Sequence, residues 1–575
     1  MAQQRLQRRA QPAGVEGLDL LTRLLAARGV DPAEGLRLQM RDLLLPASMK
    51  GLPEAAIRVA DAMASRERLL VVGDYDADGA TSTALLLLGL RAMGFDGGDF
   101  LVPSRFTYGY GLTTELVRVA AALEPRPSLL ITVDNGISSV EAVEEARALG
   151  MDVVVTDHHL PGESVPAACA IVNPNQPGCD FPSKCLAGVG VVFYLLGALR
   201  AELRARGWFA SRALAVPNLA DFLDLVALGT VADVAALDAN NRVLVHQGLL
   251  QLRKGRGRPG IRALLAMAGR EPARATTADL GFQAGPRLNA AGRLDDMSLG
   301  IRCLMEEDPV AARAMAAQLD TLNRQRRQIE DDMQREALQL LDREYTTDEG
   351  RWGVCLYQPE WHQGVVGLVA SRLKERLHRP VIAFAPAGEG QLKGSARSIR
   401  GLHMRDVLAA IDARHPQLMG RFGGHAMAAG LSLPEVHYAR FAEAFDAEVR
   451  RVLDPAALQG VLETDGELPP SEFTQPNASL LREAAPWGQH FPEPVFDGVF
   501  HLHEQRIVAE KHLKLVVSPA SDAGLRLEGI AFNVDTAAWP DHAAQRARLA
   551  YRLDVNEYRG RRSLQLQVAQ IEPIE

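Results

Sequence analysis

The chain has 575 residues, of which 47% are hydrophobic and 23% charged, a balance typical of globular proteins with sizeable cores. No apolar run reaches the roughly 18 residues of a membrane span, and the start (Met1 to Arg5) leads into polar, basic sequence and not into a secretory signal, so we expect a cytoplasmic protein. Five cysteines without a C-x-x-C pair fit a reducing compartment and argue against zinc, and the net charge of −8 does not by itself favour a nucleic-acid partner.

The first 300 residues are predicted to form a helical segment followed by an α/β domain. Apolar residues at three- and four-residue spacing predict helix over about 15–65. From 69 to about 230, apolar strands alternate with amphipathic helices, the pattern of a parallel sheet covered on both faces. The strand candidates are 69–72, 129–133, 151–155 and 169–172, and the helix candidates include 80–93 and 138–149.

The remainder predicts a connecting helix, a second α/β domain and a small β-barrel. A polar, Gly-free helix spans about 308–343, and strands at 352–357 and 380–385 precede a Gly-rich stretch near 420–430. Short alternating strands, such as 513–517 and 564–568, fit a β-barrel of the OB-fold kind. The predicted boundaries are 1–48 for the N-terminal helical segment, 49–300 for the α/β domain, 301–348 for the connecting helix, 349–455 for the second α/β domain and 465–575 for the barrel.

The segment Asp74-Tyr75-Asp76-Ala77-Asp78-Gly79 is the most informative stretch of the chain. Its carboxylates follow the apolar strand 69–72 on alternate positions, so they can converge at the strand's carboxyl end and would repel one another without a cation. A calcium loop is excluded because it needs a Glu at its twelfth position, where this chain has Leu85. A polar turn without metal stays the alternative for this motif alone.

Three more clusters make the metal interpretation stronger. Val133-Asp134-Asn135-Gly136 and Thr156-Asp157-His158-His159 follow predicted strands, and Asp233 follows the apolar run 225–231, which we also assign to a strand. Ligands bind at the carboxyl ends of strands in open α/β sheets. The predicted ligands are Asp76, Asp78, Asp134, His158 and Asp233, an oxygen-rich set suited to Mn²⁺ or Mg²⁺. Five ligands suggest two ions about 4 Å apart, with Asp134 as the bridge. Taken alone, each motif also has an ordinary structural explanation, because Asp-Asn-Gly commonly forms a turn and His-His is commonly a polar pair.

These motifs resemble the DHH phosphoesterase superfamily, whose signature triplet is Asp157-His158-His159 and whose first motif matches Asp74 to Gly79. Gly423-Gly424-His425 to Gly430 resembles the phosphate-binding motif of the DHH-associated domain. The domain order resembles that of the superfamily's bacterial exonucleases, which degrade single-stranded DNA from the 5′ end. In that resemblance, 49–300 is the DHH domain, 349–455 the DHH-associated domain and 465–575 an OB-fold.

The resemblance implies a metal-dependent exonuclease that releases 5′-mononucleotides in recombination and repair. It places metal ligands at the five positions above, His159 near the scissile phosphate and Asp74 as an auxiliary ligand, with Asp76 and Asp134 also in the catalytic centre. Some family members carry a His where this chain has Val72, two residues before Asp74. Partners implied are a single-strand-binding protein and a helicase, and we expect a monomer.

Several segments fit a bound DNA strand. Their shared features are cations beside aromatics, hydroxyls or glycines, which suit base stacking and phosphate binding. The predicted contacts are Arg105 and Tyr110; Arg287, Asn289 and Arg293 near a turn; Lys393, Ser395 and Arg397; Gly423, Gly424 and His425 before a small-residue helix; and Tyr558, Arg559 and Arg561 in a hairpin. Of these, Arg105, Arg287, Lys393, Ser395 and Arg397 form a hypothetical pocket for the 5′-phosphate. A basic cluster (Arg253, Lys254, Arg256, Arg258 and Arg262) is either solvated surface or a nucleic-acid contact.

Two other functions compete with this assignment. A DHH hydrolase of short oligonucleotides or cyclic dinucleotides would share the chemistry, but such enzymes typically lack an OB-fold. A catalytically silent DNA-binding scaffold would have lost carboxylates, whereas every matched ligand position is filled here.

Overall fold

A computed structural model describes residues 4–15, 17–104, 107–109, 111–344, 350–558 and 561–574. The chain divides into two compact units. One contains Val30–Arg324 and Glu483–Glu493, and the other contains Met1–Gly29, Gln325–Arg482 and Pro494–Glu575. Among the described residues, no helix is both long enough and apolar enough to cross a membrane.

The unit that contains Val30–Arg324 is built on a five-stranded sheet of order β3-β2-β4-β5-β6, in which all pairs are parallel. The strands are β2 (Leu69–Val72), β3 (Gly98–Leu101), β4 (Leu129–Val133), β5 (Asp152–Thr156) and β6 (Ala170–Val172). Every residue of β2 and β4 is buried, because helices cover both faces of the sheet. The predicted strands at 69–72, 129–133, 151–155 and 169–172 and the predicted helices at 80–93 and 138–149 are confirmed to within about three residues at each end.

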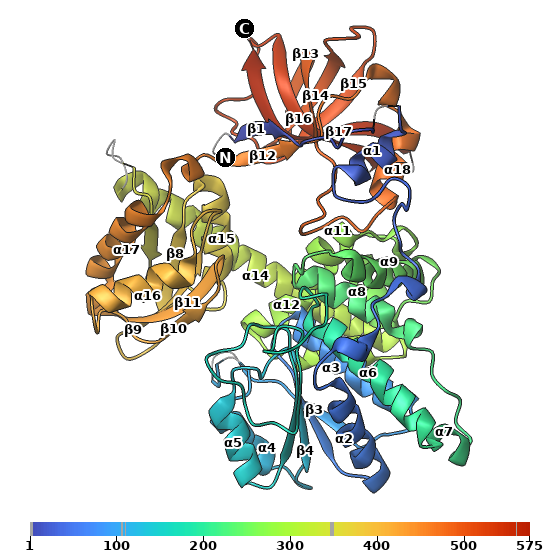
Figure 1. The fold of residues 1–575 in the computed structure, drawn as a ribbon. Coiled ribbons are helices and arrows are strands. Elements are labelled where there is room, and N and C mark those ends of the chain that lie inside the picture. Colours follow the sequence, from blue (N-terminus) through green and yellow to red (C-terminus); the bar gives the residue numbers. More distant parts are fainter. Residues whose placement is uncertain are drawn as a thin grey trace. The chain divides into compact units, whose positions relative to one another are not determined.

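The two faces of this sheet are covered by different helices (Figure 1). One face packs against α4 (Thr114–Ala121) and α5 (Val140–Ala148). The other packs against α2 (Leu52–Ser65), α3 (Ala77–Ala92) and α6 (Gly188–Ala205). Further helices follow the sheet: α7 (Trp208–Ser211), α8 (Leu223–Ala232), α9 (Ala239–Arg253), α10 (Pro259–Met267), α11 (Thr277–Asp279), a π-helical turn (Leu280–Ala284), α12 (Gly285–Leu294) and α13 (Ser298–Met305).

The predicted connecting helix is α14 (Pro309–Glu344), whose residues are divided between the two units. In the second unit, a mixed sheet of order β10-β11-β9-β8-β7 confirms the smaller α/β domain. Its strands are β7 (Val354–Tyr357), β8 (Val381–Pro386), β9 (Gln391–Arg397), β10 (Phe422–Gly424) and β11 (Ala428–Pro434). Its helices are α15 (Val366–Leu377), α16 (Met404–Arg414) and α17 (Tyr438–Val452).

The predicted C-terminal barrel is also confirmed. It is closed in the order β13-β14-β15-β17-β16. The strands are β13 (Phe496–Val508), β14 (His512–Pro519), β15 (Leu527–Ala531), β16 (Arg546–Tyr558) and β17 (Arg561–Ile574), and α18 (Gln475–Glu483) packs against their core. β16 and β17 are antiparallel and pair Tyr558 with Arg561, as the predicted hairpin requires.

The N-terminal helical segment was predicted wrongly over much of its length. Arg5–Arg8 form strand β1, which pairs in parallel with β12 (Val461–Thr464). Among the described residues before position 49, the α-helix is limited to Leu20–Ala26, α1. Leu20 and Leu24 of α1 pack into the barrel core. The apolar spacing therefore marked a short helix that covers the barrel, a contact between residues more than 400 positions apart.

Candidate metal centre and substrate-binding residues

The loop between β2 and α3 carries the first group of carboxylates. Asp76 is the N-cap of α3, and its Oδ1 accepts a hydrogen bond from Gly79 N at 2.9 Å. Asp78 lies in the first turn and is 1% exposed. Its two carboxylate oxygens accept hydrogen bonds from Gly188 N (2.6 Å) and Val189 N (3.0 Å), at the N-terminus of α6. The positive end of the α6 dipole therefore helps to hold this buried carboxylate in place.

Asp134 follows β4 and lies next to β5. Its backbone has a left-handed φ of +62°, a conformation that Asp tolerates better than most residues, and the residue is 2% exposed. The neighbouring Asn135 is fully buried and donates from Nδ2 to Val72 O at 3.1 Å. Asn135 thereby links the ends of β2 and β4, which places Asp134 beside the Asp74–Asp78 loop.

The loop after β5 is organised by Asp157, which is 1% exposed. Its carboxylate accepts hydrogen bonds from Ile137 N (2.9 Å) and His158 N (2.7 Å), and it lies 2.7 Å from His159 Nδ1. Asn175 Nδ2 also donates to His158 O at 2.6 Å. Sequence reasoning assigned no site role to Asp157, although it opens the Asp-His-His triplet, and its acceptor contacts here orient both histidines.

Asp233 enters the centre from a helix, so its predicted placement at a strand end was wrong. Residues 223–232 form α8, and Asp233 is its C-cap. All but two of the helix residues are buried, so its sequence lacks a polar face, and a short apolar run of this kind does not distinguish a buried helix from a buried strand.

The four loops bring their side chains together. His158 Nε2 lies 3.1 Å from Asp134 Oδ1, 4.0 Å from Asp78 Oδ2 and 3.9 Å from Asp233 Oδ2. The potential ligand atoms form three groups, and within each group these atoms lie within 4.8 Å of one another. The groups are Asp74, Asp76 and Asp134; Asp78, His158 and Asp233; and Asp134, His158 and His159. Asp134 and His158 each belong to two of the groups, and of the two only the carboxylate of Asp134 has two oxygens with which to bridge ions.

The electrostatics of these groups show why they need a cation. Burial, followed by the charge of Asp76, raises the pKa of Asp78 to about 7. Burial and the charges of Asp78 and Asp76 raise the pKa of Asp134 and of Asp233 well above the ordinary value. Carboxylates that oppose one another's ionisation so strongly are stabilised by a divalent ion, and an oxygen-rich set with one imidazole fits Mn²⁺ or Mg²⁺.

The two histidines titrate in opposite directions. Burial and the neighbouring His159 lower the pKa of His158 to about 4, so its imidazole is neutral and can act as a ligand. Burial also lowers the pKa of His159, but the hydrogen bond and charge of Asp157 outweigh it and raise that pKa to about 9. His159 is therefore a cation at neutral pH, 31% exposed in its side chain and available to a phosphate.

Three of the predicted DNA contacts share one face of β9. Lys393, Ser395 and Arg397 alternate along the strand, and Arg397 Nη1 donates to Ser395 Oγ at 3.0 Å. Arg397 Nε also donates to Ser371 Oγ of α15 at 3.1 Å. A Cβ at Gly367 would meet both Arg397 and Ser395 at 2.9 Å, so this glycine makes room for the pair.

The helix predicted after Gly423-Gly424-His425 is absent, and strand β11 takes its place. β10 and β11 form an antiparallel hairpin, and β11 pairs with β9 so that Gly430 lies opposite Ser395. The alternation of Leu431 and Leu433 with polar or small residues suits a strand, and long-range pairing with β9 outweighs the helical tendency of the alanines. The predicted helix N-terminus is therefore wrong, and His425 lies exposed in a hairpin loop. A substrate contact by Gly423, Gly424 and His425 stays a prediction.

Residues 286–293 were predicted near a turn but lie in helix α12. Arg287 is 5% exposed and forms an ion pair with Asp320 at 2.9 Å. Asn289 Oδ1 accepts a hydrogen bond from Ala77 N at 2.8 Å, so it supports the carboxylate loop, and Arg293 is half-buried. In the basic cluster, Arg258 is largely buried beside Asp224.

Four of the predicted contacts fall outside the described part of the chain: Arg105, Tyr110, Arg559 and the side chain of Tyr558. Arg561 is exposed at the start of β17. The combination of Arg105 and Arg287 with the β9 residues into one 5′-phosphate pocket stays a prediction.

Comparisons with known proteins agree with this architecture. The DHH family N-terminal domain matches residues 68–230, the DHHA1 domain matches 352–451 and the RecJ OB domain matches 464–570. The single-stranded-DNA-specific exonuclease RecJ of Dickeya dadantii is 56% identical over 556 residues, which cover 96% of both chains. The RecJ of Escherichia coli is 55% identical with the same coverage. The chain belongs to the RecJ family.

Two solved RecJ structures extend the likeness to the fold. RecJ from Thermus thermophilus in complex with Mn²⁺ is 30% identical with a TM-score of 0.80, covering 99% of this chain and 80% of that one. The same protein in complex with Mg²⁺ is 28% identical with a TM-score of 0.74, and the match covers 99% of this chain and 79% of that one. Membership in the RecJ family confirms the predicted superfamily, the OB-fold and the single-strand-specific exonuclease. It decides against a short-oligonucleotide hydrolase and a silent scaffold. The predicted Mn²⁺ or Mg²⁺ agrees with the ions in the two solved RecJ structures.

Proposed function

We propose that this chain hydrolyses single-stranded DNA from its 5′ end and releases 5′-mononucleotides, with two divalent cations, Mn²⁺ or Mg²⁺, in the centre between β2, β4, β5 and α8. The observation that carries the proposal is the convergence of acids and a neutral histidine from four loops, with Asp134 shared between two groups of potential ligands. The RecJ membership supplies the substrate class.

The ion-holding residues in this proposal are Asp76, Asp78, Asp134, His158 and Asp233, with Asp74 as an auxiliary ligand. Divalent cations bound there lower the pKa of a water molecule and offset charge on a phosphate. Gly188 N and Val189 N fix the Asp78 carboxylate, so that its position does not depend on the substrate. Asn289 holds the same loop through Ala77 N.

His159 is assigned to the scissile phosphate. Its Nδ1 is bonded to Asp157, which directs Nε2 to the opposite side of the ring and keeps the imidazole protonated. A cation at this place stabilises the negative charge that develops on the phosphate oxygens, and Nε2–H can donate its proton to the leaving oxygen. Asp157 is a positioning residue in this scheme.

In this proposal, residues of β9 and of the barrel bind the DNA strand. Lys393, Ser395 and Arg397 on β9 would bind the 5′-phosphate. The exposed Arg561, beside the tip of the barrel hairpin, would contact the single strand farther from its end. A single-strand-binding protein and a helicase are the proposed partners, in recombination and repair in the cytoplasm.

The test uses a long single strand labelled at either end, with Mn²⁺, Mg²⁺ or chelator. We expect the 5′ label to appear first as a mononucleotide, the chelator to abolish the reaction, and Asp134→Ala to be inactive. Early release of the 3′ label, or full activity in chelator, would contradict the proposal. For the β9 face, Arg397→Ala should lose the preference for 5′-phosphorylated over 5′-hydroxyl ends, whereas the exposed Arg440→Ala on α17 should retain it.

A further inference from the structure

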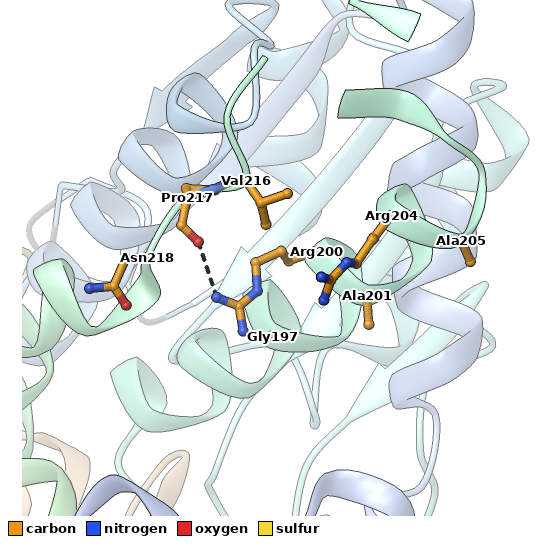
Figure 2. Close-up of a pocket in the computed structure, with 8 residues that line it drawn as sticks. All are labelled: Gly197, Arg200, Ala201, Arg204, Ala205, Val216, Pro217 and Asn218. Atoms are coloured by element: carbon orange, nitrogen blue, oxygen red, sulfur yellow. Dashed lines mark hydrogen bonds between the residues drawn. The ribbon is translucent and has the colours of Figure 1, made fainter. Parts of the chain in front are cut away.

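A cavity of about 600 Å³ lies beside the C-terminal half of α6, away from the loops of the metal centre. Figure 2 shows its walls, which come from α6 on one side and from residues 216–218 on the other. The lining residues are Gly197, Arg200, Ala201, Arg204, Ala205, Val216, Pro217 and Asn218. Gly188, at the start of α6, is 12 residues from Arg200, or about 18 Å along the helix, so a ligand here does not reach the metal centre.

Two arginines give this cavity its charge. Arg200 and Arg204 are four residues apart on α6, and like charges at this spacing destabilise a helix. Burial and then the charge of Arg204 lower the pKa of Arg200. Within the described part of the chain, neither arginine forms an ion pair, and the Arg200 guanidinium donates to the Pro217 carbonyl at 3.0 Å (Figure 2).

Arg206, the C-cap residue of α6, shows the contrast. Arg206 pairs with Glu202 at 2.7 Å and with Asp61 at 2.6 Å. The surroundings of α6 thus supply carboxylates to one arginine and withhold them from the two that face the cavity. An unbalanced pair of guanidinium groups, one of them half-buried, is the arrangement that an anion stabilises.

Gly197 adds a second, independent observation. It lies inside α6, where glycine is disfavoured relative to alanine, and its φ is not in the left-handed region. A Cβ built there meets no described atom within 4 Å, so close packing does not explain the glycine. The missing side chain instead leaves space at the edge of the cavity, one helical turn before Ala201.

We infer that this cavity binds a small phosphate-bearing anion, a nucleoside monophosphate or free phosphate. The guanidinium fork of an arginine matches phosphate oxygens in pairs, and the volume lies in the range of sites for small molecules. Val216 and Pro217 offer apolar surface to a base, whereas the Asn218 amide is engaged by Asp221 and Ala220 N and only borders the cavity. The idea that a released 5′-mononucleotide occupies the site rests on the proposed function, whereas the phosphate chemistry does not.

The experiment measures binding of dAMP, inorganic phosphate and deoxyadenosine to the full chain by calorimetry in chelator, which removes metal-dependent binding at the centre. The variants are Arg200→Ala/Arg204→Ala and Ala201→Glu, which adds a competing carboxylate at an exposed helix position. The control is Arg147→Ala, an exposed arginine of α5. Because no catalysis is measured, a chain without nuclease activity would still bind.

We expect dAMP to bind at least tenfold more weakly to both variants and unchanged to Arg147→Ala. The melting temperature of the double variant should change little, because the relief of repulsion offsets the loss of the Arg200–Pro217 hydrogen bond and of the interaction of Arg204 with the helix dipole. Tighter binding of dAMP than of phosphate identifies a nucleotide site, and equal binding identifies a phosphate site. Unchanged dAMP affinity in both variants, or deoxyadenosine binding as tightly as dAMP, would overturn the inference.

Discussion

Gly188 offers a test of the metal centre that substitutes none of the proposed ligands. It is the first residue of α6, and its N–H holds the Asp78 carboxylate. A Cβ added there would lie 2.7 Å from Asp134 Cβ, 2.8 Å from its Oδ1 and 3.0 Å from its Cα. The Gly188→Ala variant therefore pushes against the backbone and side chain of the proposed bridging ligand.

The size of the effect follows from these distances. An ordinary contact begins near 3.4 Å, so Asp134 and α6 must separate by about 0.7 Å, the difference between 3.4 and 2.7 Å. Misplacement of a reacting group by about 1 Å lowers a rate by about 10²-fold. We expect kcat on single-stranded DNA to fall between about tenfold and 10²-fold, and stability to fall by about 1–3 kcal/mol, the usual cost of overpacking.

The matched control is Gly190→Ala, two residues farther along α6. There the added Cβ meets Leu186 Cδ2 at 2.9 Å, the far end of a flexible side chain that can turn away. The assay compares kcat at saturating Mn²⁺, Mn²⁺ affinity by electron paramagnetic resonance, and melting temperature. Equal kcat and Mn²⁺ affinity in the two variants would refute the argument that Asp134 must keep its present position.

Three further predictions concern charge and stability. Mn²⁺ should raise the melting temperature of the wild type. Asp134→Asn should melt at a higher temperature than the wild type in chelator but gain less from Mn²⁺, because it removes one of the carboxylates whose pKa is raised by burial and mutual repulsion. A lower melting temperature of Asp134→Asn in chelator would contradict this. Arg28→Ala should lower stability by about 3–5 kcal/mol in a denaturant titration, since Arg28 and Asp465 form a pair whose side chains are 1% and 2% exposed. Burial raises the pKa of Asp497, but the hydrogen bonds and charges of its partners outweigh it, so the net pKa is lowered and its contribution is present above the unfolded pKa and lost as pH falls through the folded one. The melting temperature of Asp497→Asn should therefore decrease less between neutral and acidic pH than that of the wild type.

Most of the central sheet could be predicted because its signals are local. Strands buried on both faces consist of continuous apolar runs, so 69–72 and 129–133 were predicted at their observed bounds. Asp134 and His158 follow such strands directly, and parallel strands end at one edge of the sheet. Their convergence therefore followed from topology alone.

The features that sequence reasoning missed depend on contacts between distant residues. Asp78 is held by backbone N–H groups 110 and 111 residues away, at the start of α6. The strand at 428–434 exists because β9 pairs with it, and its small residues alone favoured a helix. Arg287 was expected to bind DNA because it is a cation, but its partner Asp320 lies two helices farther along the chain, in α14.

Helix α6 connects the two charge arguments, because its ends favour opposite charges. Its N-terminus stabilises the Asp78 carboxylate, and its C-terminal end favours cations through the same dipole. The dipole is sufficient to explain Arg204, in the last turn, without any ligand. It does not explain Arg200, one turn earlier, whose pKa is lowered by burial. If the cavity binds phosphate, Arg200→Ala should therefore weaken dAMP binding more than Arg204→Ala does. If Arg204→Ala instead weakened dAMP binding more in the same calorimetric titration, Arg204 would be the main contact, and the burial of Arg200 would not indicate a ligand.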